Sequence, residues 1–244
     1  MHYSDWKNYF ELNKVHFSDI QWNQQDYLTS EEKQLISASI QQFQKGENSE
    51  GKHFYAFAKT FPEPLYLECI KLFIAEEQTH AEVLGKFMHK HGIPTIKKHW
   101  VDGCFRWLRK LADLENSVTV LVTAEIIAKV YYNALMNCTG SMLLKRICLQ
   151  ILKDEDQHII FQCYALSYFY LRKNGVRRFI TRSFHFVLMV GTIVLVWMYH
   201  KRILIKGGYS FNKFLSETLS IFFEAEEIMK NKKPMVQKFL IPVT

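Results

Sequence analysis

The sequence predicts an all-α protein in which four long antiparallel helices form a bundle and two further helices follow. Helix breakers are sparse, with 10 Gly and 5 Pro among 244 residues, so long helices can run uninterrupted. Along four segments the apolar residues recur at steps of three and four, the period of an amphipathic helix. The turns within each pair of segments are short, which makes the paired helices antiparallel neighbours.

The first predicted helix covers residues 30–60 and begins at a capping box. Thr29 is its expected N-cap, and Glu32 stands three residues later, where its carboxylate can bond back to the N-cap backbone. Pro62 and Pro64 then interrupt the chain, and the second can occupy the first turn of the next helix. We expect that second helix to end at Gly92, which opens a Gly-Ile-Pro stop signal.

The third helix is expected from an N-cap at Asp102 to Cys138, and the fourth from the Gly140-Ser141 turn to Lys173. The longer connection between the second and third helices lets one hairpin dock across the other. The predicted organisation has four parts: an N-terminal arm at 1–28, the four-helix bundle at 29–173, an apolar and basic helical extension at 174–231, and a tail at 232–244.

Composition and cysteine usage favour a globular protein in a reducing compartment. The chain is 48% hydrophobic and 23% charged, which excludes a disordered chain. Its five cysteines are odd in number and contain no CxxC pair, which argues against a disulfide framework or a zinc knuckle. The N-terminus lacks a secretory signal pattern. We therefore expect a cytoplasmic protein, with membrane association as the alternative.

The extension is both apolar and basic. Residues 183–199 contain no charged side chain, and they are flanked by Arg177, Arg178 and Arg182 on one side and by Lys201 and Arg202 on the other. Seventeen residues are at the lower limit for crossing a bilayer. The favoured interpretation is a helix buried against the bundle or at a homodimer interface. The alternative is peripheral membrane contact through 176–206. We expect no nucleic-acid partner.

Each of the four long helices carries an acidic residue on the face that should be apolar. These residues are Glu47, Glu77, Glu125 and Glu155. A charged side chain in a core is costly unless it is paired or bound to a metal. Because four helices share this feature near their middle, we expect one common pairing or metal site to offset the cost of all four buried charges.

Two ExxH segments strengthen this interpretation. His80 follows Glu77 by three residues and His158 follows Glu155 by three, so each pair lies on one helix face. Thirty residues separate Glu47 from Glu77, and thirty separate Glu125 from Glu155. Each half of the bundle therefore contains the same features in the same order and at the same spacing: a Glu, a hairpin turn and an ExxH segment. This repeat favours Glu47 over the nearby Glu50.

This pattern resembles the ferritin-like di-iron carboxylate superfamily, which includes the ribonucleotide reductase small subunit, bacterial monooxygenases and rubrerythrins. In that superfamily one Glu from each of two helices and an ExxH from each of the other two bind two metal ions. The resemblance implies bridging roles for Glu77 and Glu155, terminal carboxylates at Glu47 and Glu125, and terminal imidazoles at His80 and His158.

The resemblance also assigns residues around the ligands. Asp154 would hydrogen-bond His80, Glu76 would hydrogen-bond His158, and Glu50 would be an outer or channel residue. Carboxylate-rich sites with one histidine per metal suit iron, with manganese as the alternative. The implied partners are an external electron donor and a small apolar or lipid-like substrate.

At three points the sequence differs from particular members of this superfamily. Leu84 stands where the reductase subunit carries its radical tyrosine, and Lys129 stands where some monooxygenases carry a threonine. The absent CxxC excludes a complete rubrerythrin. The expected function is a dimetal oxidoreductase that uses dioxygen to hydroxylate or desaturate an apolar or amphipathic substrate. The alternatives are a ferroxidase or iron-storage protein, a peroxidase or manganese-catalase-like protein, and a non-enzymatic metal-binding helical module.

Overall fold

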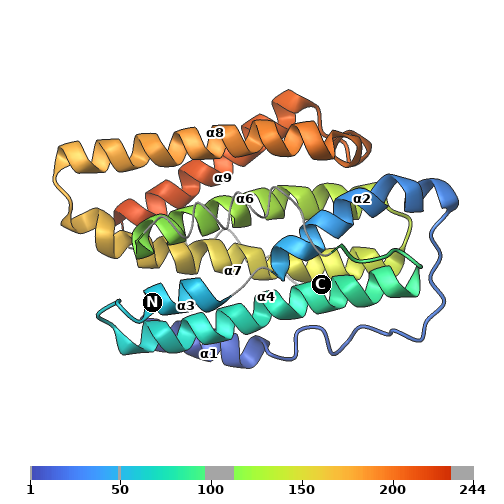
Figure 1. The fold of residues 1–244 in the computed structure, drawn as a ribbon, viewed down its shortest axis with the longest axis horizontal. Helices are drawn as coiled ribbons and strands as arrows, with labels where there is room; N and C mark the ends of the chain where they lie inside the picture. Colours follow the sequence, from blue (N-terminus) through green and yellow to red (C-terminus); the bar gives the residue numbers. More distant parts are fainter. Residues whose placement is uncertain (1, 49–50, 97–112, 232–244) are drawn as a thin grey trace.

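A computed structural model describes residues 2–48, 51–96 and 113–231, and within these ranges the chain is all-helical. Figure 1 shows the helices side by side along the long axis of the molecule. The helices are α1 (Tyr3–Asn13), α2 (Ser30–Glu47), α3 (Gly51–Ala58), α4 (Pro64–Lys90), α6 (Leu114–Cys138), α7 (Met142–Arg172), α8 (Gly175–Lys206) and α9 (Phe211–Asn231).

Two central helices organise the packing. Helix α4 contacts α1, α2, α3 and α7, and helix α6 contacts α7, α8 and α9. A single core cluster of buried apolar side chains joins these helices. Because α2, α4, α6 and α7 all meet at this core, side chains from four helices can converge inside it.

The first predicted helix is interrupted, which corrects the expectation of one continuous helix over 30–60. Its start is as predicted, since the Thr29 hydroxyl accepts a hydrogen bond from the Glu32 backbone N–H. Helix α2 nevertheless ends at Glu47, with Asn48 as its C-cap, and α3 begins at Gly51. Gly, Asn and Ser in this short stretch are poor helix formers. The break places Glu47 at the end of a helix.

The boundaries of α4 and α7 follow the expected signals, whereas the start of the third helix does not. Pro64 stands in the first turn of α4, and Gly92 adopts the left-handed φ of +62° just beyond its C-cap. Helix α7 is capped by the Ser141 hydroxyl. Helix α6 begins at Leu114, where the Asp113 carboxylate caps it, which corrects the expectation of one continuous helix from 102 to 138. The expected cap at Asp102 lies outside the described residues.

The N-terminal arm lies against α4, but its first part is a helix that the sequence analysis missed. Trp6 and Phe10 are one turn apart on α1, and both are fully buried. A carboxylate further along the arm, that of Asp26, lies 3.0 Å from His91 at the end of α4 and accepts a hydrogen bond from Ser141 at the start of α7. The arm is thus attached to the bundle at both of its ends.

Helices α8 and α9 form the extension and cover α6 and α7. Their connection approaches α6 closely: a Cβ atom at Gly207 would lie 2.7 Å from the Cα of Ala134. Among the described residues, two helices are long and apolar enough to cross a membrane, judged by length and composition alone. Helix α6 is mostly buried in the core, whereas only 28% of the apolar window in α8 is buried. The expectation was a helix buried against the bundle or at a homodimer interface, and the described chain buries one face of α8 only.

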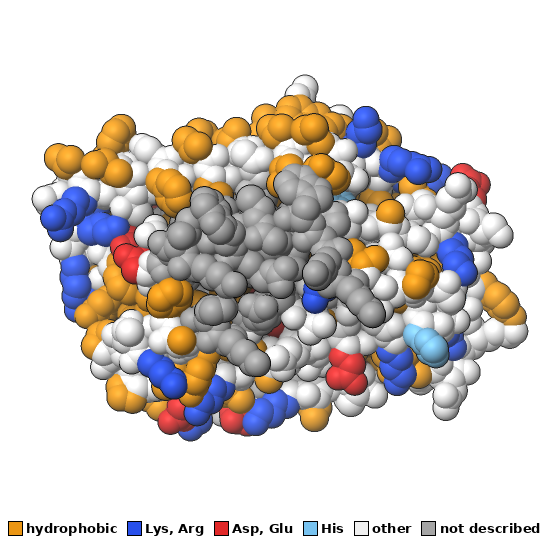
Figure 2. Space-filling model, viewed as in Figure 1, with side chains coloured by type: hydrophobic (Ala, Val, Ile, Leu, Met, Phe, Trp, Pro, Cys, Tyr) orange, Lys and Arg blue, Asp and Glu red, His pale blue; other side chains and the backbone are white. Residues whose placement is uncertain are grey.

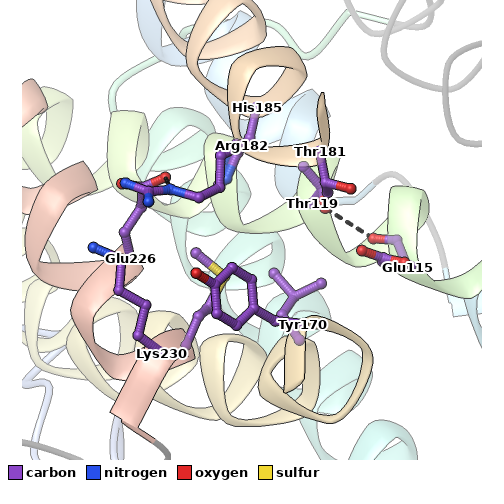
Figure 3. Close-up of a pocket in the computed structure, with 10 residues that line it drawn as sticks. Glu115, Thr119, Tyr170, Thr181, Arg182, His185, Glu226 and Lys230 are labelled. Carbon is purple, nitrogen blue, oxygen red and sulfur yellow. Dashed lines mark hydrogen bonds and ion pairs between the residues drawn. The ribbon is translucent and has the colours of Figure 1, made fainter. Parts of the chain in front are cut away.

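A small cavity lies among α6, α7, α8 and α9 (Figure 3). Its volume of about 20 Å³ admits a single water molecule, so it is not a substrate site. Arg182 and Glu226 form a two-point ion pair at its wall, with contacts of 3.0 and 2.8 Å. The wall also includes His185, whose Nε2 has no hydrogen-bond partner among the described residues.

Acidification is expected to destabilise the protein partly through His185. Burial lowers the pKa of this histidine to about 4 from an ordinary value of 6.5. Between these values the unfolded chain binds the proton and the folded protein does not, so stability falls as the pH falls. Urea unfolding at pH 7 and pH 4.5 should show that His185→Leu removes about 2–3 kcal/mol of this loss. The matched variant His89→Leu, at an exposed histidine on α4, should leave the loss unchanged.

Candidate metal centre

The six predicted ligands come together in two overlapping groups. The end of α2 supplies Glu47, helix α4 supplies the first ExxH, α6 supplies Glu125 and α7 supplies the second ExxH. The first group contains Glu47, Glu77, His80 and Glu155, and the second contains Glu77, Glu125, Glu155 and His158. Within each group the ligand atoms lie within 4.8 Å of one another. The two residues common to both groups are Glu77 and Glu155.

Each histidine has one nitrogen beside an outer carboxylate. His80 Nε2 lies 3.0 Å from Asp154 Oδ2, and His158 Nε2 lies 3.3 Å from Glu76 Oε1. The resemblance implied a hydrogen bond in each pair: His80 makes it with Asp154, whereas His158 Nε2 lies near Glu76 but has no hydrogen-bond partner among the described residues. The other nitrogen, Nδ1, faces the shared carboxylates: it lies 3.6 Å from Glu77 in His80 and 3.0 Å from Glu77 in His158. Such an arrangement fixes the ring orientation and leaves Nδ1 for a ligand.

The atoms that face the middle of the cluster are buried and lack hydrogen bonds. Among the described residues this holds for Nδ1 of both histidines, for both oxygens of Glu155 and for one oxygen each of Glu77 and Glu125. Buried polar atoms without partners are costly in a native protein. Metal–ligand bonds of about 2.1 Å place atoms on opposite sides of one ion about 4.2 Å apart, and the ligand atoms of each group all lie within 4.8 Å of one another. The donor set therefore fits metal ions.

Charge crowding shows in the pKa values of these groups. Burial and the neighbouring Glu125 hold the pKa of Glu155 well above its ordinary range, and burial together with Glu77 does the same for Glu47. Burial alone would lower the pKa of His158, but the surrounding carboxylates raise it well above 6.5. Bound cations would offset this repulsion between the carboxylates.

The N-terminal arm contributes an amide that the sequence analysis did not predict. The Asn13 side-chain N–H₂ group donates to Glu76 at 2.8 Å and to Asp154 at 2.9 Å. One amide thus connects the two outer carboxylates that contact His158 and His80. Helix α1 has no clear apolar period, and the chain separates these partners by 63 and 141 residues, so no local pattern indicates the contact.

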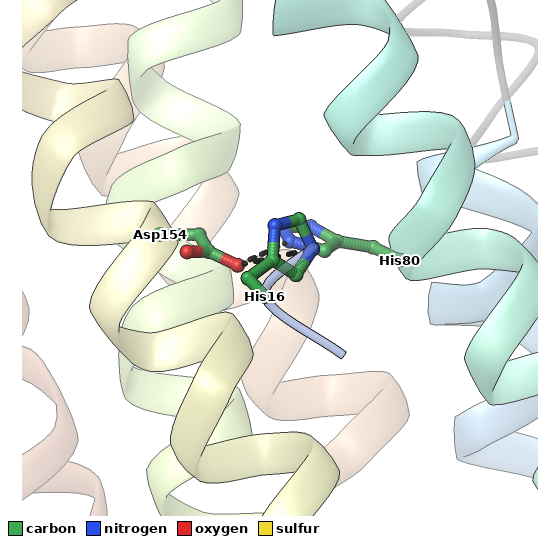
Figure 4. A group of neighbouring side chains, drawn as sticks. All are labelled: His16, His80 and Asp154. Atoms are coloured by element: carbon green, nitrogen blue, oxygen red, sulfur yellow. Dashed lines mark hydrogen bonds and ion pairs between the residues drawn. The ribbon is translucent and has the colours of Figure 1, made fainter. Parts of the chain in front are cut away.

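His16 extends the same network (Figure 4). Its Nε2 lies 3.7 Å from Asp154 Oδ2, and its ring stands edge-on to the ring of His80 at 6.0 Å. His16, His80 and Asp154 form a third group of metal-ligand spacing. Because His80 and Asp154 already contact each other, we interpret this group as an outer layer of the centre.

Glu47 also contacts an aromatic and polar cluster. The Tyr132 hydroxyl donates a hydrogen bond to Glu47. Tyr131, next in the cluster, accepts a hydrogen bond from Ser39, whose hydroxyl lies 2.7 Å from His200 Nδ1 on α8. Tyr132 therefore contacts one of the expected ligands directly.

Two further polar residues near the ligands have defined positions. Lys129, one turn after Glu125, forms an ion pair with Asp156. Gln162, one turn after His158, is fully buried, and neither of its amide atoms has a hydrogen-bond partner among the described residues. Glu50 lies outside the described residues, so its predicted outer role stays a prediction.

The fold and the site define a helical protein with buried carboxylate–histidine groups that could hold metal ions. Comparison with protein-family models, with curated proteins and with solved structures finds no match.

Proposed function

We propose that the protein is a ferritin-like dimetal oxidoreductase that binds two iron ions and uses dioxygen to hydroxylate or desaturate an apolar or amphipathic substrate. The observation that carries this proposal is that two ligand groups, each with one histidine, share Glu77 and Glu155. A carboxylate that belongs to both groups could bind both ions, and this would hold the two ions next to each other. The oxygen- and nitrogen-rich donor set suits iron, with manganese as the alternative.

A bound iron pair would supply the redox chemistry for activating dioxygen. In a hydroxylation, one C–H bond of the substrate becomes C–OH, the second oxygen atom leaves as water, and two electrons and two protons are consumed. The chain has no CxxC pair for a rubredoxin-type iron, so an external protein or small-molecule reductant must supply the electrons.

The residues of the chain would orient the ligands and control protons. Asp154 hydrogen-bonds His80 Nε2 and Glu76 lies 3.3 Å from His158 Nε2, which leaves Nδ1 of both rings available for the metals. The Tyr132 hydroxyl donates to Glu47 and so limits the directions in which that carboxylate can move. Burial of Glu155 and both ligand histidines keeps water away from the reacting centre.

Three alternatives use the same centre differently. A ferroxidase or storage protein would oxidise iron and retain many ions per chain. A manganese-catalase-like protein would convert hydrogen peroxide to water and dioxygen without an electron donor, whereas a peroxidase would reduce it to water with electrons from an external donor. A non-enzymatic metal-binding module would bind ions without turnover. The histidine present in both halves of the site favours the oxygen-activating class by resemblance.

Metal analysis of the purified chain tests the proposal. After expression in iron-supplemented or manganese-supplemented medium, we expect about two ions per chain, the number that two overlapping groups can hold. The iron form should give the Mössbauer spectrum of a coupled diferric pair. Oxygen consumption with a reductant is then screened against fatty acids and other apolar compounds. A chain that binds no metal in either medium overturns the proposal, and many irons per chain would favour storage.

A further inference from the structure

The outer face of α8 carries an apolar stripe that no part of the described chain covers. Ile180, Phe184, Val187, Gly191, Val194 and Met198 follow one another at alternating steps of four and three residues, and all are exposed. We call these six residues the outer stripe. At 1.5 Å per residue it is about 27 Å long. In Figure 2 hydrophobic side chains gather along the edge of the molecule where Figure 1 draws α8.

The opposite face of α8 is already occupied. His185, Met189, Ile193, Val196 and His200 are buried there, against the helices that α8 contacts, which are α2, α6 and α9. A helix whose inner face is packed against the protein from His185 to Leu204 cannot cross a bilayer alone. It can lie in the plane of a surface and insert its other face.

Basic residues stand at both ends of the outer stripe. Arg177 is exposed before it, and Lys201, Arg202 and Lys206 are exposed after it. Helix α8 contains no Asp or Glu at all. The nearby Arg182 already pairs with Glu226, so it adds little to the outward charge. An apolar stripe with cations at both ends is complementary to an acyl layer beneath anionic headgroups.

The same charges disfavour a second copy of this chain as the occupant. Two α8 helices packed stripe to stripe would place cations against cations in either direction, because neither helix offers a carboxylate. We propose that the outer stripe docks the protein on an anionic lipid bilayer, with α8 parallel to the membrane plane. The proposal does not depend on the bound metal.

Flotation of the full chain with lipid vesicles tests this docking. The vesicles contain either phosphatidylcholine alone or phosphatidylcholine with roughly one third phosphatidylserine. We expect the protein to float with the anionic vesicles, and flotation to weaken as salt screens the basic residues. The triple variant Ile180→Ser/Val187→Ser/Met198→Ser should lose at least tenfold in partitioning. Replacement of Lys201, Arg202 and Lys206 by Gln should reduce the preference for phosphatidylserine.

A matched variant controls for the general loss of exposed apolar surface. Leu12, Val15 and Met142 are exposed apolar residues away from α8, and their triple replacement by Ser should leave flotation unchanged. Equal loss in this control overturns the assignment to α8. A wild-type chain that stays at the bottom with both vesicles overturns the docking. So does a dimer in solution, measured by sedimentation, that the outer-stripe variant dissociates, because the occupant is then a second copy.

Discussion

Replacement of Glu155 by Gln is expected to abolish binding of both metal ions and, in the metal-free protein, to increase stability. Glu155 belongs to both ligand groups, so its loss removes one ligand from each ion. In the metal-free protein its carboxylate is fully buried beside other carboxylates, and its pKa is raised above 4.5. As the pH rises above 4.5, the unfolded chain loses this proton while the folded protein keeps it. This cost of folding grows with pH, and Gln does not have it.

Two measurements on the Glu155→Gln variant show whether Glu155 is a metal ligand or has only a structural role. Elemental analysis after iron loading should fall from about two ions per chain to none, and Glu77→Ala should behave alike. Urea unfolding of the chelator-treated proteins at pH 7 should show a gain of about 1–3 kcal/mol for Glu155→Gln, with a smaller gain at pH 5. The control Glu82→Gln, at an exposed position of α4, should change neither quantity. Full metal occupancy in Glu155→Gln would refute the ligand assignment.

Asn13 is expected to govern metal affinity although it touches no ligand. Its amide donates to both outer carboxylates, and these contact the two ligand histidines. Leu has nearly the same shape but no donor, so Asn13→Leu leaves both carboxylates short of one hydrogen bond. Loss of such outer contacts typically costs 10–100-fold in metal affinity. Asn13→Asp should be weaker still, because it adds a third carboxylate where the first two already meet.

The order of affinities is the informative result for Asn13. Competition with a chelator should rank the wild type above Asn13→Leu and Asn13→Leu above Asn13→Asp. The control Asn137→Leu changes an exposed asparagine on α6 and should bind metal as the wild type does. If Asn13→Asp binds as tightly as the wild type, the amide does not position the carboxylates. A folding defect is recognised separately by circular dichroism of the metal-free variants.

The site residues on the long helices could be predicted because helical periodicity is local. Glu77 and His80 share a face by their spacing alone, and the repeat of the same register in α7 indicates that both faces meet. The start of α2 at Thr29 and the end of α4 near Gly92 follow from capping and turn chemistry, which act within a few residues.

Features that depend on distant partners could not be predicted in the same way. The contacts of Asn13 and His16 with the centre are tertiary, and the weak apolar period of α1 did not even indicate a helix. The break after Glu47 could not be located because several poor helix formers lie close together there. A helix can tolerate each of them singly, so none of them alone predicts a break. The composition of α8 identified an apolar helix, but only the packing shows that one side of it is buried and the other exposed.

The contact between Asn13 and Asp154 can form only late in the synthesis of the chain. These two residues are 141 positions apart, so at 5–20 residues per second the amide waits roughly 7–28 s for its partner. Until then Trp6 and Phe10 have only part of their final surroundings, because Phe161 of α7, which contacts both rings, has not been made. The second ExxH belongs to that same late helix. Assembly of a complete metal centre is therefore a late event, which begins only after most of the polypeptide has been translated.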